Sequence, residues 1–423
     1  MNFNTIKKAL LPTAVILALS PAVASAAVLV QCPDDGADTA VTGQPNTKCM
    51  HLSAGDGFAT MADGTTSYIF SFGDLTGSKT RTANQKRVAI QRGLLAAEWP
   101  APTIELEEGQ EFYLNLTNVG MVMRPDLFDP HSAHFHGFPQ ASTVFDGLPE
   151  SALSIGMGAT LTYYYKLNDP GTYMYHCHVE ATEHMQMGML GNLYVKAGQN
   201  KTGCADLSCA ATTGTAGYAY NDGDGSTFYD KEYPIQLGSF DGAFHDASGS
   251  TQPLPFALMR DNYPMINGRG YPDTIDPRTD GQDGQAPFPP ADGFNTTNAT
   301  GGGNPFVNLT GQPVSSLITA TPGEKVLLRI SNLAITRFYT LQSLGIPMQV
   351  VGKDAKQLVT QDGATNLYYK TNSVTLGGGE SYDVILDTTG VAAGTYYLHS
   401  ANLNYLSNDD EEFGGMMTEI VIN

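Results

Sequence analysis

Hydrophobic and polar residues alternate along many short stretches of this chain. The segment EFYLNLTN at 111–118 has this pattern, and so does KVLLRISN at 325–332. Successive side chains of a β-strand point to opposite faces, so the alternation indicates strands with one buried face. Other short runs rich in Val, Ile, Thr and Tyr lie between Gly and Pro residues that favour turns. The pattern predicts an all-β protein built from β-sandwiches.

The predicted strands occur in two similar copies. GTYMYH at 171–176 is matched by GTYYLH at 394–399, and GMLGNLYV at 188–195 is matched by GMMTEIVI at 415–422. A chain of 423 residues is also longer than one hydrophobic core usually serves. The repeats therefore predict two related β-domains.

The domain boundaries follow from composition. Gly, Asp, Ala and Thr are concentrated between the two copies, and no apolar period continues through that region. We expect the first domain at 27–200, a linker at 201–230 and the second domain at 231–423.

The N-terminus has the features of a secretory signal peptide. Lys7 and Lys8 form a charged region, 9–19 is apolar, and Ala24-Ser25-Ala26 offers small residues for cleavage. We expect residues 1–26 to be removed and the mature protein to be periplasmic or extracellular. No later apolar run approaches the roughly 20 residues of a membrane-spanning helix.

Charge limits the classes of partner. The formal net charge is −20 at pH 7, which disfavours binding to nucleic acid or anionic membranes. An acidic surface serves solubility, and it can also steer cationic partners or metal ions.

The candidate chemistry is concentrated in GTYMYHCHVEATEHMQMGMLGNLYV at 171–195. Cys177 stands between His176 and His178. On a strand the cysteine would face one way and both histidines the other, because alternate residues share a face. One strand can thereby serve two adjacent metal centres.

Other residues can complete both centres. The loop after the cysteine supplies His184 and Met189, and HSAHFHG at 131–137 offers His131. A thiolate, two imidazoles and a weak axial thioether form the ligand set of a blue, electron-transferring copper. On the following strand His134 and His136 share a face, so they can join the two histidines beside the cysteine.

The cysteine count supports this interpretation. The chain has five cysteines. In an exported protein two local disulfides, Cys32–Cys49 and Cys204–Cys209, are the natural pairing. Cys177 remains single, which favours a buried or metal-bound thiol.

The H-x-x-H-x-H-G segment at 131–137 and the H-C-H segment at 176–178 strongly resemble the motifs of multicopper oxidases. The resemblance implies two cupredoxin-like Greek-key domains, with a type 1 copper beside a trinuclear copper cluster. It also implies a laccase-like oxidation of a phenolic or metal-ion donor, coupled to reduction of O₂. Electrons would pass through Cys177 to its two histidine neighbours. His184 follows Cys177 by seven positions, two more than is usual in the family.

The same resemblance implies a role for an acidic residue and for a neighbouring subunit. Asp146, in VFDGLPE, stands where laccases and ferroxidases carry an acid that delivers protons, although an ordinary Asp-Gly turn is equally compatible with the sequence. Two-domain members of the family complete the cluster with histidines of a neighbouring subunit, so a homotrimer is expected.

The second domain departs from the family pattern. Gln342-Ser343-Leu344-Gly345 stands where H-x-H-G is expected, and His399-Ser400-Ala401 stands where H-x-H is expected. His399 alone matches. His51 and His245 lie outside any motif, and we expect both to be surface residues.

Several readings of this departure remain open. The cluster can be reduced to one or two coppers, or a different subunit can supply the missing ligands. Alternatively the protein is a non-catalytic cupredoxin that carries copper or exchanges electrons with another protein. A copper nitrite reductase is a further alternative, but that family has only one histidine beside the cysteine.

Overall fold

The computed structural model describes residues 31–33, 44–250, 252–276, 311–409, 411 and 414–423. Residues 31–423 form one compact unit, and the predicted signal peptide at 1–26 lies outside the described residues. Within the described part, none of the helices combines the length and the apolar character that crossing a membrane requires.

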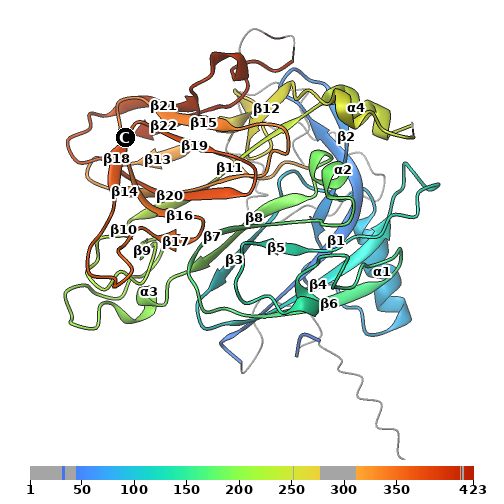
Figure 1. Cartoon of the computed structure of the whole chain (residues 1–423), viewed down its shortest axis with the longest axis horizontal. Coiled ribbons are helices and arrows are strands. Elements are labelled where there is room, and N and C mark those ends of the chain that lie inside the picture. The colour runs from blue at the N-terminus through green and yellow to red at the C-terminus, as the bar shows by residue number, and fades with distance from the viewer. Residues whose placement is uncertain (1–30, 34–43, 251, 277–310, 410, 412–413) are drawn as a thin grey trace, which may run out of the picture. The chain divides into compact units, whose positions relative to one another are not determined.

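The first sandwich consists of two four-stranded sheets, ordered β2-β1-β4-β6 and β3-β8-β7-β5 (Figure 1). Its strands are β1 (Thr47–Thr60), β2 (Thr66–Asp74), β3 (Ala101–Glu107), β4 (Glu111–Gly120), β5 (His134–His136), β6 (Thr160–Lys166), β7 (Gly171–His176) and β8 (Leu190–Lys196). Their inward side chains form one hydrophobic core, in which alternate residues of β4 and of β6 are fully buried.

The second sandwich packs a seven-stranded sheet, with the path β12-β11-β14-β20-β16-β17 and β18 beside β16, against a sheet ordered β13-β22-β21-β15-β19. Its strands are β11 (Lys231–Phe240), β12 (Tyr263–Ile266), β13 (Ile318–Ala320), β14 (Lys325–Asn332), β15 (Tyr339–Ser343), β16 (Met348–Lys353), β17 (Lys356–Gln357), β18 (Tyr369–Thr371), β19 (Ser373–Leu376), β20 (Glu380–Asp387), β21 (Gly394–Ser400) and β22 (Met417–Ile422). A separate hydrophobic core fills it.

The two sandwiches repeat one topology. β4 lies between a parallel β1 and an antiparallel β6, as β14 lies between a parallel β11 and an antiparallel β20. β7 lies between β8 and β5, as β21 lies between β22 and β15. The predicted all-β class with two cupredoxin-like domains is therefore confirmed.

Helices are few and short. They are α1 (Ala83–Gly93), α2 (Ala181–Gln186), α3 (Gln199–Thr202) and α4 (Gly242–Ser248), with single 3₁₀ turns at Thr143–Phe145, Phe256–Leu258, Asp273–Ile275 and Leu403–Tyr405. α1 begins at a complete capping box, in which Thr82 accepts from the backbone of Gln85 and the Gln85 side chain accepts from the backbone of Thr82. α2 lies in the loop that carries the predicted metal ligands.

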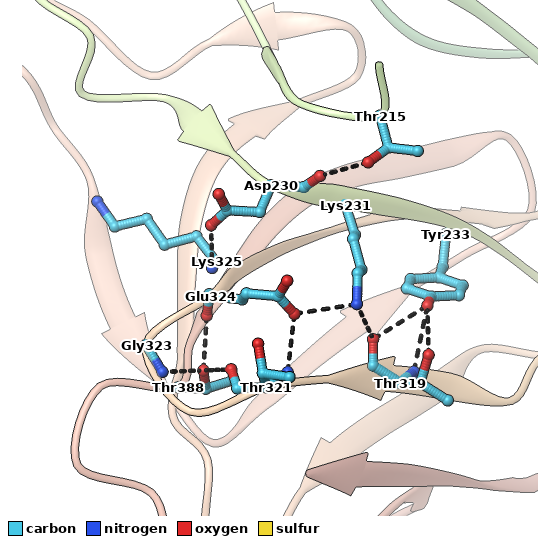
Figure 2. A network of polar contacts seen from close by, with 10 residues as sticks. All are labelled: Thr215, Asp230, Lys231, Tyr233, Thr319, Thr321, Gly323, Glu324, Lys325 and Thr388. Carbon is cyan, nitrogen blue, oxygen red and sulfur yellow. Dashed lines mark hydrogen bonds and ion pairs between the residues drawn. The ribbon is translucent and has the colours of Figure 1, made fainter. Parts of the chain in front are cut away.

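The segment at 201–230, predicted as a linker, has structure of its own. It contains the Cys204–Cys209 disulfide and the hairpin of β9 (Gly217–Tyr218) and β10 (Phe228–Tyr229). Tyr220 and Tyr229 are buried against second-domain residues. Figure 2 shows how its end joins the second domain: Lys325 N–H donates to Asp230 over 2.8 Å.

The first domain packs β7 against the second domain. Thr172 donates its hydroxyl to Asp383 and accepts from Arg329, and Ser381 donates to the Thr172 carbonyl over 2.7 Å. The charged pair of Arg329 and Asp383 is almost entirely buried, and Arg329 also pairs with Glu232 over 2.7 Å. Every residue of β7 is consequently buried, up to the histidine at its end.

Candidate metal centre

One continuous segment carries most of the predicted ligands. β7 ends at His176, Cys177 and His178 follow, and α2 leads into β8. Cys177 N–H donates to the Met189 carbonyl over 3.0 Å, which joins the two ends of the loop. Cys177 is fully buried in the first core, whereas the rings of His176 and His178 stack with centroids 5.7 Å apart. The cysteine and its neighbours thus have different surroundings, as strand alternation predicts.

A first set of ligands surrounds the thiol. Cys177 Sγ lies 3.2 Å from His184 Nδ1 and 4.0 Å from His131 Nδ1. The backbone N–H of Ser132 also points at the sulfur, over 3.5 Å. Met189 is completely buried in the same hydrophobic cluster as Cys177. The structure therefore brings together the four residues predicted for a type 1 copper within one buried region.

An acid that the sequence did not reveal lies behind this set. Asp129 Oδ1 is 3.1 Å from His184 Nε2, the ring nitrogen remote from the sulfur. Burial alone would raise the pKa of Cys177, but His184 and His131 outweigh burial and lower that pKa to about 5. Burial likewise opposes charge on His184, yet Cys177 and Asp129 raise its pKa well above the ordinary value. The thiol is thereby held as a thiolate, the form that binds metals.

A second set consists of His134, His136 and His176, whose ring nitrogens lie within 4.8 Å of one another, with the ring of His178 beside them. The His134 centroid lies 5.2 Å from those of His176 and His178, and the His136 centroid lies 5.5 Å from that of His176. Burial, with the charges of neighbouring histidines, lowers the pKa of His176 to about 3. Burial also lowers the pKa of His136. Neutral imidazole is the form that ligates a metal, so these environments favour ligation.

Asp146 lies directly beside the second set. His134 Nδ1 is 2.6 Å from the Asp146 carbonyl oxygen and 3.3 Å from its carboxylate. A partner on one ring nitrogen fixes the orientation of a histidine and leaves the other nitrogen for a metal. The contact is compatible with the predicted proton-delivering acid and with an orienting role.

His399 joins neither set among the described residues. It lies on β21 opposite Gln342 of β15, where the first domain has His176 opposite His134. Its Nδ1 bonds the carbonyl of the next residue over 2.8 Å, and His176 does the same over 2.9 Å. His399 therefore repeats the orientation of His176 in the second domain.

The expectation that His51 and His245 are surface residues was wrong. Both side chains are fully buried. His51 contacts Ser78 O at 3.0 Å and Thr117 Oγ1 at 2.8 Å, and His245 contacts two backbone carbonyls. Neither residue belongs to a repeated motif, so the sequence carried no sign of these partners.

Both predicted disulfides are present. Cys32 pairs with Cys49, and Cys204 pairs with Cys209, which leaves Cys177 as the free, buried cysteine.

Both ligand sets fit copper by their chemistry. Sulfur–nitrogen separations of 3.2 and 4.0 Å suit ligands that share one ion at about 2 Å each. A thiolate with two imidazoles and a thioether selects a blue copper, whereas clustered imidazoles suit copper among several metals. Cys177 shares a peptide bond with each of two members of the second set, so the two sets are covalently adjacent.

Comparison with known proteins agrees with this geometry. Two family models, both described as multicopper oxidase, match residues 78–200 and 256–423. The chain belongs to the multicopper oxidase family. This is a family of copper-binding oxidoreductases.

Individual relatives of the family are distant. Multicopper oxidase MmcO of Mycobacterium tuberculosis is 25% identical over 69% of this chain and 47% of its own length. Copper resistance protein A of Escherichia coli is 26% identical over 70% of this chain and 45% of its own length. The chain therefore spans about half the length of the curated relatives it matches.

Solved structures share the fold. A blue copper oxidase from Nitrosomonas europaea superposes with a TM-score of 0.58 at 22% identity, over 88% of this chain and 85% of that one. A copper nitrite reductase from the same organism superposes with a TM-score of 0.54 at 16% identity, over 89% and 94%. At these identities the likeness concerns the fold alone.

Proposed function

We propose that the chain is an exported copper oxidase that removes single electrons from a phenolic or metal-ion donor and reduces O₂. The observation that carries this proposal is the adjacency of the two ligand sets, with Cys177 in the first and its neighbours His176 and His178 in the second. A protein that only carried copper would have no need to couple a thiolate site to four clustered histidines.

Each set has an assigned part in the proposal. His131, Cys177, His184 and Met189 hold the first copper, and His134, His136, His176 and His178 hold the second copper site. Bound copper supplies one-electron redox chemistry at the first set and a place for O₂ reduction at the second. Asp146 keeps a carboxylate beside His134, where the reduction of O₂ to water consumes protons.

The surroundings of His184 favour an electron donor that does not contact its imidazole ring. His184 is only 1% exposed, and Asp129 covers its outer nitrogen. Electrons would therefore enter across Asp129 and the adjoining surface. Phenols, Mn(II), Fe(II), Cu(I) and a small electron-transfer protein are all compatible with such an entry.

We further infer a homotrimer, in which His399 of one subunit completes the second set of another. Three strand positions of the second domain, Thr395, Tyr397 and His399, correspond to Thr172, Met174 and His176 of the first. Thr172 and Met174 pack against second-domain residues, whereas Thr395 and Tyr397 are exposed. A head-to-tail contact of this kind closes into a ring when the rotation permits.

Export and the domain limits belong to the same proposal. The charged, apolar and small-residue regions of 1–26 support secretion to the periplasm or the exterior, and the two disulfides agree with an oxidising compartment. The limits 27–200 and 231–423 remain our proposed domain boundaries, with 201–230 between them.

Copper stoichiometry tests the proposal. Copper-loaded protein should bind more than one copper per chain, show the intense visible band of a copper–thiolate centre, and consume O₂ with one of the donors. Cys177→Ser should abolish the band and the O₂ uptake while the histidine-bound copper remains. Persistence of the band in that variant would overturn the assignment of the first set.

The alternative is a non-catalytic cupredoxin, and the second domain favours it. Gln342, Leu344 and Ala401 stand where the family pattern has histidine, so one chain offers few additional ligands. One copper per chain, an intact band and no O₂ uptake with any donor would support this alternative.

A further inference from the structure

The loop that carries His184 and Met189 is held from outside by the second domain. α2 has six residues, and its N-cap residue Glu180 has a left-handed backbone and makes no side-chain capping bond. An isolated helix of this length has no stability of its own, because nucleation outweighs the few hydrogen bonds gained. The position of His184, near the end of α2, must therefore be fixed by contacts to other elements.

Three consecutive carbonyls of this loop have partners on other elements. Phe70 N–H donates to Met187 O over 3.0 Å, and the Ser71 hydroxyl donates to Gly188 O over 2.7 Å. Both donors belong to β2 of the first domain. The remaining carbonyl, that of Gln186, lies 3.0 Å from His245 Nε2. His245 is the second-domain member of this group.

His245 is itself firmly placed. It lies on α4, which has Asp241 as its N-cap and packs beside β2 and α2 (Figure 1). Its other nitrogen, Nδ1, is 2.6 Å from Tyr68 O, and its ring packs on Phe240 with centroids 4.2 Å apart. Both ring nitrogens thus face backbone carbonyls, one of a core strand and one of the metal-ligand loop, and a neutral imidazole has one N–H to donate to either of them.

A second contact of α4 reinforces the first. Ser248 Oγ donates to Glu183 Oε1 over 3.3 Å, and Arg124 of the first domain donates to the Ser248 carbonyl. Phe244, one turn before Ser248, is buried in the first-domain core. α4 is thus attached to α2 at two points while its own position is fixed by the first domain.

We infer that His245 is a positioning residue for the first copper site. Through Gln186 it sets the path of the chain between His184 and Met189, and hence the separation of the imidazole and thioether ligands. The two extra residues of this loop lie between Cys177 and His184, and Glu183, the partner of Ser248, belongs to that part. This inference rests on the proposed copper assignment, which the wild-type spectrum tests separately.

Two substitutions test the contacts of the two ring nitrogens of His245 independently. His245→Gln places an amide N–H where Nε2 lies and can keep the contact with Gln186. His245→Asn places its amide N–H nearer Nδ1, so it can keep the contact with Tyr68 but loses Gln186. We expect the asparagine variant to shift the visible band, the copper hyperfine splitting and the reduction potential, and the glutamine variant to remain close to wild type.

His51→Asn is the matched control, because His51 is also fully buried with two contacts in the first domain. It should lower stability and leave the copper spectrum unchanged. Equal spectral shifts in His51→Asn and His245→Asn would overturn the inference, and so would wild-type spectra in both His245 variants. A wild-type protein without a copper–thiolate band would instead reject the copper assignment, and the inference with it.

Ser248→Ala decides the matter if His245→Asn does not fold. This variant keeps the imidazole and removes only the hydrogen bond to Glu183. A shift of the copper–thiolate band in Ser248→Ala supports the positioning of the loop by α4. A wild-type spectrum in Ser248→Ala overturns it.

Discussion

Asp129 places a carboxylate charge next to His184, a proposed ligand of the first copper. Its carboxylate lies 3.1 Å from His184 Nε2 and is 10% exposed. A buried negative charge stabilises the more positive, oxidised metal, because little solvent screens it. We expect Asp129→Asn to raise the reduction potential by an amount equivalent to roughly 1.5–3 kcal/mol, the usual size of a hydrogen bond to a charged group. A redox titration followed in the visible band measures it, and an unchanged or lower potential contradicts the expectation.

Glu98 makes the stability of the fold depend on pH. Burial raises its pKa to about 8, from 4.5 in an exposed carboxyl, so the folded protein keeps it protonated near neutrality. Because the folded state then binds the additional proton, its contribution to stability is complete below pH 4.5 and is lost as the pH rises through 8. Glu98→Gln keeps an acceptor for Asp74 N–H, which lies 3.2 Å from Oε1.

Urea unfolding of wild type and of Glu98→Gln at pH 5 and pH 8 tests whether Glu98 is protonated in the folded protein. The free energy of unfolding of wild type should fall by a few kcal/mol relative to that of Glu98→Gln across this interval. Other titrating groups, such as His51, are common to both proteins and cancel in the difference. A difference that does not change with pH would show that Glu98 is ionised in the fold.

Individual residues also show where sequence reasoning ends. Cys177 could be identified because counting cysteines left it single and because its neighbours are histidines. Asp129 precedes His131 by two positions, yet nothing local distinguishes it from a surface acid. His245 lies more than fifty residues beyond the loop it contacts, and only the packing of α4 brings them together. Such long-range contacts have no periodic signature in the sequence.

At the scale of elements, strands with strong alternation were predictable and the turns between them were not. β4, β7, β14 and β21 agree with the repeats in the sequence. Gly377–Gly379 between β19 and β20 is typical of a turn, but nothing in its sequence indicates that it packs against the second ligand set. A Cβ on Gly379 would lie 2.7 Å from His136 Nε2, and the φ of this residue is +90°.

Gly379→Ala should therefore disturb the second set and leave the first intact. We expect fewer histidine-bound coppers per chain with an unchanged copper–thiolate band, and a stability loss of roughly 1–2 kcal/mol from the positive φ. Gly390→Ala is the control, because Gly390 has a φ of +75° and no atom near its Cβ position. It should lose stability and keep its copper. Equal copper contents in the two variants would reject the proposed contact.

At the scale of the molecule, the two domains are repeats with unequal surroundings. The end of β7 is covered by the second domain of the same chain, while its counterpart in β21 carries Tyr397 with 42% of its surface exposed. Leu344 on the adjoining turn is 51% exposed. An apolar strand face that duplicates a buried one is explained if a second copy of the chain covers it.

A charge on this face should then prevent assembly. We expect Tyr397→Glu to convert a trimer into monomers in sedimentation experiments, because a buried carboxylate without a partner is costly. It should also lower the copper content of the second set, since the neighbouring subunit's His399 is withdrawn, while the copper–thiolate band persists. Leu207→Glu is the control, because Leu207 is 89% exposed and lies in the Cys204–Cys209 disulfide loop, outside β21 in the chain. A monomeric wild-type protein, or a trimer unaffected by Tyr397→Glu, would exclude this interface and leave each chain with its own four histidines.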